Sequence, residues 1–350
     1  MNTLSKFSPS WRQALPQIIA LAAVLLADWL IFPDFFQVRL QDGHLFGSIV
    51  DVFNRGAPVA ILSIGMTLVI ATRGIDLSVG AVMAIAGAVA ATLINSGHSM
   101  PIAVLVALAV GIGCGLWNGL LVAVLDIQPI VATLILMVAG RGIAQLITEG
   151  QIVTFNDPDL IAVATGSFLG LPMPVVITLV MLAITILVFR TTALGLFIEA
   201  IGINRLSSTY AGVNTRIVLA IAYAWCGLTA AVAGVIAAAN IKGADANNAG
   251  LWLELDAILA VVIGGTSLFG GRFRLFLSFI GAIIIQAMNT GILLSGFKPE
   301  FNLIVKAIVI IVILIMQSDA PALALNRYRL WRERHAPNQT APGSTAGGAA

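Results

Sequence analysis

The residues that could do covalent chemistry are few in this sequence and lie far apart. Cys114 and Cys226 both lie within apolar stretches, where a thiol usually serves as a small packing group. The three histidines, His44, His98 and His335, are widely separated along the chain. No nucleophile has a base at a recognisable spacing, and the ligands for a zinc site are too few. The sequence therefore predicts no catalytic residue, no metal site and no cofactor in this chain.

A polar segment that could have a mechanistic role is Arg73-Gly-Ile-Asp-Leu-Ser-Val-Gly80, which interrupts two apolar stretches. Asp76 or Ser78 can cap the helix that follows, and Gly74 eases the turn. Glycines beside a short polar break also suit a segment that lines a transport pathway. Helix capping and a pathway role therefore both remain open for this segment.

A second segment, within residues 191–215, has the pattern of a short surface helix. Asn204 is a suitable N-cap, and Gly212 is a suitable C-terminal stop. Apolar side chains recur at i, i+4 and i+7, namely at Leu206, Tyr210 and Val213. Two helical turns are marginal alone, so this helix needs a partner surface. That surface is either another protein or the chain's own bundle and membrane.

Two further features have competing explanations. Glu254 and Asp256 begin an apolar helix, where the helix dipole favours carboxylates, and glycine pairs follow at residues 264–265 and 270–271. These glycines lack the Gly-Lys-Ser/Thr of a phosphate loop and favour close packing or a kinked helix. Arg141 lies within an apolar stretch and must face protein or water. It is either a pathway or gating residue, or a structural partner of a carboxylate or carbonyl group.

The elements that position these segments are predicted by composition. The chain has 350 residues, of which 59% are hydrophobic and 10% charged, and its mean hydropathy is +1.02. Such values are far from those of soluble domains and predict an all-α polytopic membrane protein with about ten spans. The expected spans are 14–32, 56–72, 78–96, 101–125, 129–148, 172–190, 216–238, 254–270, 275–293 and 301–317.

The distribution of charge predicts the orientation of the bundle. Most of the 18 basic residues fall in cytoplasmic segments if the amino terminus is inside, which also places the carboxyl terminus inside. This gives a cytoplasmic N-terminus (1–13), a transmembrane domain (14–318) in contact with lipid, and a cytoplasmic, largely disordered tail (319–350). The net charge of +2 without a basic surface cluster excludes nucleic acid as a partner. A weak echo pairs Asn118 and Pro129 with Asn289 and Pro299.

Together, several motifs resemble those of one known family. They are Arg73–Ala81, Asn118–Ala123, Pro129–Leu134, Ala139–Gly142, Gly202–Asn214 and Glu254–Gly271, in one order from residue 14 to 318. These segments are similar to the ribose-type family of ABC sugar importer permeases. Within that family, residues 151–156, 242–252 and 289–297 are most similar to the galactofuranose permeases.

The resemblance implies a set of partners and a location. We expect a cytoplasmic ABC ATPase that binds ATP and Mg, a second homologous permease, and a periplasmic sugar-binding protein, all at the bacterial inner membrane. It also implies that the loop 191–215 docks on the ATPase as a coupling helix. The residues expected to take part are Gly202, Asn204, Arg205, Leu206, Ser207, Tyr210, Gly212 and Asn214.

The function expected from these observations is movement of a monosaccharide by alternating access, without covalent chemistry in this chain. The candidates for the pathway or its gates are Asp76, Ser78, Asn118, Thr133, Arg141, Gln145, Gln286 and Asn289. Each could equally be a hydrogen-bonding contact between helices. The main alternative is a secondary transporter that works alone, and a channel or an intramembrane enzyme is more distant. Scarcity of intramembrane carboxylates, with Asp28 alone well inside a span, argues against a proton-driven carrier.

Overall fold

The computed structural model describes residues 10–41, 44–296, 301, 303–308 and 311. The tail expected at 319–350, most of the N-terminal segment 1–13 and much of the span expected at 301–317 lie outside the described residues. The chain divides into two compact units after Ile304, and all the elements labelled below belong to the first. Phe301, residues 303–308 and Ile311 are helical as well.

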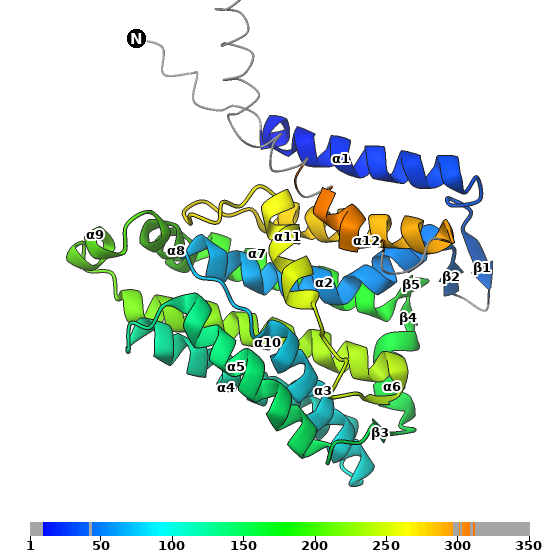
Figure 1. The fold of residues 1–350 in the computed structure, drawn as a ribbon, viewed down its shortest axis with the longest axis horizontal. Coiled ribbons are helices and arrows are strands. Elements are labelled where there is room, and N and C mark those ends of the chain that lie inside the picture. Colours follow the sequence, from blue (N-terminus) through cyan, green and yellow to red (C-terminus); the bar gives the residue numbers. More distant parts are fainter. Residues whose placement is uncertain (1–9, 42–43, 297–300, 302, 309–310, 312–350) are drawn as a thin grey trace, which may run out of the picture. The chain divides into compact units, whose positions relative to one another are not determined.

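The described elements are helices joined by short connections and three small β-ladders (Figure 1). The helices are α1 (Ser10–Ile31), α2 (Ser48–Ala71), α3 (Val79–Asn95), α4 (Met100–Ala123), α5 (Pro129–Ile147), α6 (Pro158–Thr165), α7 (Met173–Thr191), α8 (Ala193–Ile203), α9 (Arg205–Tyr210), α10 (Thr215–Ile241), α11 (Leu253–Ile263) and α12 (Leu275–Leu294). The strands are β1 (Arg39–Gln41), β2 (His44–Phe46), β3 (Val153–Thr154), β4 (Ser167–Phe168), β5 (Leu171–Pro172) and β6 (Gly243–Ala244).

The strands pair antiparallel as β1 with β2, β3 with β6 and β4 with β5. The pairing of β3 with β6 is the only long-range ladder in the described part of the chain, with Val153 opposite Ala244 and Thr154 opposite Gly243. It fastens the connection after α5 to the segment that follows α10.

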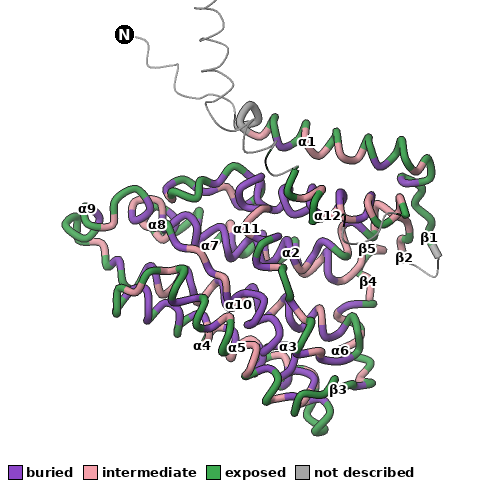
Figure 2. The backbone as a smooth tube through the Cα atoms, in the orientation of Figure 1, coloured by how far each residue is buried: buried purple, intermediate pink, exposed green. Residues whose placement is uncertain are grey.

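The membrane character of the chain is confirmed. Seven helices of the described residues are long and apolar enough to span a membrane, and α3 and α8 are shorter apolar helices. Apolar side chains such as Leu105, Val138 and Leu187 are exposed on α4, α5 and α7, where lipid can cover them. In contrast, α2 is buried along most of its length (Figure 2).

Two expected boundaries differ from the structure. Helix α2 begins at Ser48, ahead of the expected residue 56, because Asp51 and Arg55 lie on an exposed face while Val52 is buried. The helix expected at 254–270 ends as α11 at Ile263. A Cβ atom at Gly264 would lie 2.6 Å from the backbone nitrogen of Ser278, and Gly265 has φ +80°. The chain therefore turns at this glycine pair, where only residues without a side chain fit.

The core is built from two matching sets of helices. Helices α2 and α10 pack against each other and run in opposite directions (Figure 1). Helix α10 packs on α3 and α4, which contact each other, and α2 packs likewise on α11 and α12. Exchanging α2 with α10, α3 with α11 and α4 with α12 preserves this pattern, as in an inverted repeat. The sequence echo between Asn118 and Asn289 falls on the matched helices α4 and α12.

Helices α4 and α10 approach each other through their backbones. A Cβ atom at Gly115 would lie 2.2 Å from the carbonyl oxygen of Tyr223, and one at Gly111 would lie 2.6 Å from that of Gly227. In a membrane, such small residues permit the van der Waals contact that holds helices together. One face of α4 is therefore packed tightly on α10.

One helix of each set, α3 in one and α11 in the other, begins only after a non-helical segment. After α2 the chain re-enters the bundle without helical structure through residues 72–78, and α3 begins only at Val79. After α10 the chain re-enters through residues 242–252, and α11 begins at Leu253. Figure 1 shows both helices starting in the interior rather than at an end of the bundle.

Candidate translocation site and coupling element

The two interrupted helices meet at their N-termini. A Cβ atom at Gly80 would lie 2.4 Å from the carbonyl oxygen of Gly250 and 2.6 Å from Oε2 of Glu254. Gly250 has φ +71°, and its own Cβ would lie 2.4 Å from the carbonyl oxygen of Gly80. Discontinuous helices whose N-termini converge within the bundle are typical of transporter substrate sites. We call this contact the junction.

A buried polar cluster holds the α3 side of the junction. Oδ1 of Asp76 accepts the backbone N–H of Ser78 at 2.9 Å and its hydroxyl at 2.6 Å. Nδ2 of Asn118 donates to Oγ of Ser78 at 2.8 Å. All three side chains are buried, with exposed fractions of 1% or less.

Thr133 of α5 completes this arrangement. Its hydroxyl accepts the backbone N–H of Leu77 at 3.2 Å and lies 3.2 Å from the carbonyl oxygen of Ile75. The structure thus brings together four of the expected pathway residues, Asp76, Ser78, Asn118 and Thr133. Helix capping alone does not describe them, because Ser78 is the N-cap of α3 but makes no side-chain capping bond.

Arg141 and Gln145 of α5 hold the segment on the α11 side. Nη1 of Arg141 donates to the carbonyl oxygens of Ala246 and Ala249 at 3.0 and 2.6 Å. Nε2 of Gln145 donates to Oδ1 of Asn247 at 2.7 Å. Arg141 therefore faces protein, as an arginine within an apolar stretch must. Its hydrogen bonds are to backbone carbonyl groups, which was one of the alternatives left open by the sequence.

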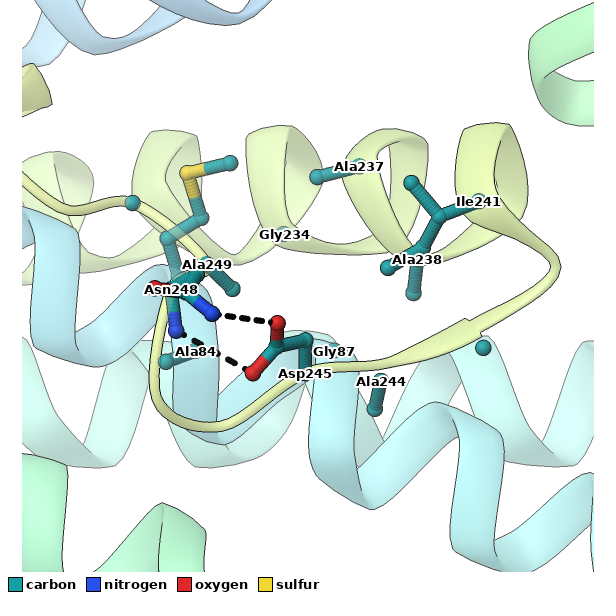
Figure 3. A pocket seen from close by; sticks show the side chains of 13 residues that line it. Ala84, Gly87, Gly234, Ala237, Ala238, Ile241, Ala244, Asp245, Asn248 and Ala249 are labelled. Atoms are coloured by element: carbon teal, nitrogen blue, oxygen red, sulfur yellow. Dashed lines mark hydrogen bonds between the residues drawn. The ribbon is translucent and has the colours of Figure 1, made fainter. Parts of the chain in front are cut away.

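A cavity of about 230 Å³ lies beside the junction, between α3, α10 and residues 243–250 (Figure 3). Its wall is formed mainly by alanine and glycine, with polar side chains from Asp245 and Asn248. Nδ2 of Asn248 donates to Oδ2 of Asp245 at 2.7 Å. The cavity is smaller than a usual ligand cleft of about 300–1,000 Å³.

The other two expected pathway residues lie elsewhere. Gln286 and Asn289 are on α12, and the Gln286 side chain packs beside Gly56 of α2. The structure therefore does not bring them together with the Asp76 cluster. Sequence reasoning also missed Asp245, Asn247 and Asn248 as individual residues. The signal available was their clustering in a polar stretch directly after an apolar span.

The expected surface helix is present as α9. Oδ1 of Asn204 accepts the backbone N–H of Ser207 at 3.0 Å, and Gly212 turns the chain with φ +86°. Asn214 caps the next helix, α10, by accepting the N–H of Ile217 at 3.3 Å. The predicted cap and stop of this helix are thus confirmed.

The apolar residues of α9 point away from the bundle. Leu206 and Tyr210 have exposed fractions of 63% and 82%, whereas Ser208 is buried. Arg205 forms an ion pair that connects α9 to the turn after α4, since its Nη1 lies 2.8 Å from Oδ1 of Asp126. The apolar side chains of α9 are therefore left to a partner surface or to the membrane.

Comparison with known proteins identifies a family and several relatives of this chain. Residues 48–314 match the family described as "Branched-chain amino acid transport system / permease component". The galactofuranose transporter permease protein YtfT of Escherichia coli (strain K12) is 65% identical over 309 residues, which cover 88% of this chain and 91% of that protein. No solved structure matches the chain.

More distant relatives also have sugar transport in their names. The fructose import permease protein FruF of Bifidobacterium longum (strain NCC 2705) is 43% identical over 281 residues, 79% of each chain. The ribose import permease protein RbsC of Escherichia coli (strain K12) is 35% identical over 316 residues, 89% of this chain and 96% of that protein.

Proposed function

The chain belongs to the branched-chain amino acid transport system permease family, and on that premise we propose that it is the membrane-spanning subunit of an ABC importer for galactofuranose. The observation that carries the proposal is 65% identity to the galactofuranose permease over nearly the whole of both chains. The relatives named for sugars favour a monosaccharide over the amino acids in the family's description.

The proposal includes partners for this chain. A cytoplasmic ATPase hydrolyses ATP with Mg, a second homologous permease completes the passage, and a periplasmic binding protein delivers the sugar at the inner membrane. The exposed apolar face of α9 supports docking of the ATPase, because Leu206 and Tyr210 lack a partner surface within the described residues.

The proposed mechanism is alternating access without covalent chemistry in this chain. A partner can shift a conformational equilibrium only by its different affinity for the two states. The ATPase must therefore grip α9 differently before and after hydrolysis. The junction at Gly80 and Gly250 is the candidate point of passage, since the polar cluster and the cavity lie on either side of it.

Reconstitution with the candidate partners in lipid vesicles tests this function. We expect sugar uptake only with ATP, the ATPase and the loaded binding protein, and hydrolysis that rises when galactofuranose is supplied. Uptake by this chain alone, driven by an ion gradient, would instead establish a secondary transporter. Stimulation by ribose or fructose but not galactofuranose would keep the importer and refute its proposed sugar.

The docking role of α9 is tested by Gly212→Val. Gly212 has φ +86°, and no atom of the described residues lies within 4 Å of the place that a Cβ atom would take, so valine strains the turn without a clash. Such strain costs about 1–3 kcal/mol and should lower uptake per ATP hydrolysed. Gly97→Val is the matched control, because Gly97 has φ +84°, equally open surroundings and a place in the turn between α3 and α4. Equal effects of the two variants would argue against docking at α9.

A further inference from the structure

We propose that Arg73 is a positioning residue that joins the coupling helix α9 to both interrupted helices, so that α9, α3 and α11 move together. The inference rests on the proposed function, because it assigns to Arg73 the transmission of the ATPase's movement to the junction. It is drawn from the backbone at Arg73, its two long-range hydrogen bonds and the packing of three glycines around it.

The backbone of Arg73 is unusual for its residue type. It has φ +67°, in the left-handed region, where the turn that ends α2 would ordinarily place glycine or asparagine. The turn is closed by the N–H groups of Arg73 and Gly74, which donate to the carbonyl oxygens of Ile70 and Val69 at 2.9 and 3.0 Å. An arginine held in this conformation indicates that its side chain is needed there.

The guanidinium group of Arg73 binds two segments that are remote in sequence. Nε donates to the carbonyl oxygen of Phe269 at 2.8 Å, and Nη2 donates to that of Ile203 at 2.8 Å. The planar guanidinium fixes these two donors relative to each other, which the single ammonium of lysine cannot do. One side chain thus bridges the end of α2, the end of α8 and the turn after α11.

The backbones on either side of Arg73 approach each other closely. The N–H of Gly271 donates to the carbonyl oxygen of Ala71 at 2.9 Å. A Cβ atom at Gly202 would lie 1.9 Å from that same oxygen, and one at Gly270 would lie 2.4 Å from Cγ of Arg73. The three segments therefore cannot slide past one another while these contacts remain.

Each segment that Arg73 bridges is connected along the chain to α9, α3 or α11. Ile203 precedes Asn204, the N-cap of α9. Arg73 begins the short segment that leads through Asp76 to the start of α3. Phe269 follows Gly264, the C-cap of α11, by five residues. A displacement of α9 is consequently passed to the helices on both sides of the junction.

The test uses the complete importer in vesicles and measures sugar imported per ATP hydrolysed. Arg73→Ala loses both hydrogen bonds from the charged group and Arg73→Lys loses at least one, so each variant should lower this ratio roughly tenfold or more. Arg272→Ala is the matched control. Arg272 is an exposed arginine in the turn after α11, and its side chain makes no hydrogen bond or ion pair with the described residues. It should keep the wild-type ratio.

A rescue separates positioning from general damage. In the Arg73→Ala background, Ile203→Cys and Leu268→Cys place thiols on the two segments that Arg73 bridges, and both native side chains are exposed. A short thiol crosslinker between them should restore the ratio, and its reductive cleavage should abolish it again. Failure of the crosslinked protein to recover would overturn the inference.

The outcomes also distinguish this inference from the proposed function. If the wild-type assembly shows no sugar-stimulated hydrolysis, the proposed function itself fails. If the wild type couples normally and an assembled Arg73→Lys protein keeps the wild-type ratio, the inference about Arg73 fails while the importer stands.

Discussion

The two segments that re-enter the bundle differ in how they are held. Residues 72–78, ahead of α3, are fastened from inside the core by the buried cluster of Asp76 and Ser78 with Asn118. Residues 242–252, ahead of α11, expose Asn247 and Asn248 and are held by Arg141 and Gln145 of α5 and by the ladder of β3 with β6. Two segments at matching positions of the repeated architecture are thus held by different kinds of contact.

We expect the two segments to differ in local stability. Local stability follows buried contacts, so residues 72–78 should open locally less often than residues 242–252, while the helices that follow the two segments still move together. Lys242 and Trp252, near the two ends of the second segment, have φ values of +53° and +65°. Left-handed conformations at such side chains store strain, as at Arg73 in the first segment.

The largest effect should come from breaking the buried polar cluster of the first segment with Asp76→Ala. The change leaves the buried N–H of Ser78 without its acceptor, and we expect a loss of about 3 kcal/mol in the free energy of unfolding. Denaturant unfolding in detergent measures it. Asp76→Asn keeps an acceptor of the same shape and should lose less; equal losses would mean that the hydrogen bond is not what stabilises the segment.

Forcing the two regions apart should have the next largest effect. In Gly80→Ala the new methyl group meets the carbonyl oxygen of Gly250, and we expect about 2 kcal/mol of destabilisation from overpacking. Thermal unfolding of Gly142→Ala provides the control, because Gly142 is also helical and its Cβ position has open space within 4 Å as far as the structure describes the chain. If both variants melt alike, the contact at the junction is not tight.

The smallest effect should be confined to the second segment. Arg141→Lys loses one of two carbonyl contacts, which is worth about 1 kcal/mol, and should speed amide hydrogen exchange in residues 243–252. Exchange in residues 73–78 should stay unchanged, as it should throughout Arg55→Lys, which alters an exposed arginine on α2. Faster exchange in both segments would show that they do not open independently.

The sequence predicted what local patterns determine. The cap at Asn204 and the turn at Gly212 follow from residues a few positions apart, and the structure confirms both. Most span boundaries were also close, because runs of apolar residues long enough to cross hydrocarbon are contiguous in the chain. The boundaries of α2 and α11 were the exceptions. The sequence pattern places the polar face of α2 outside the helix and the glycine pair after α11 within it.

What escaped prediction depends on contacts between distant residues. Arg141 was expected to face protein or water, but its carbonyl partners lie more than a hundred residues away in an irregular segment. The junction likewise depends on Gly80 and Gly250, which have no side chains to form a pattern. Gln286 and Asn289 had suitable chemistry, yet α12 packs mainly on α1, α2 and α11 and not beside the Asp76 cluster.

The close fit between α4 and α10 has a consequence for biogenesis. The glycine-lined face of α4 is synthesised about a hundred residues before Tyr223 and Gly227, its later partners. During insertion this face must remain in lipid, or against the insertion machinery, until α10 has entered the membrane. Folding of the bundle therefore waits for the second half of the chain, and nascent chains arrested before α10 should present α4 as an unpaired helix to membrane quality control.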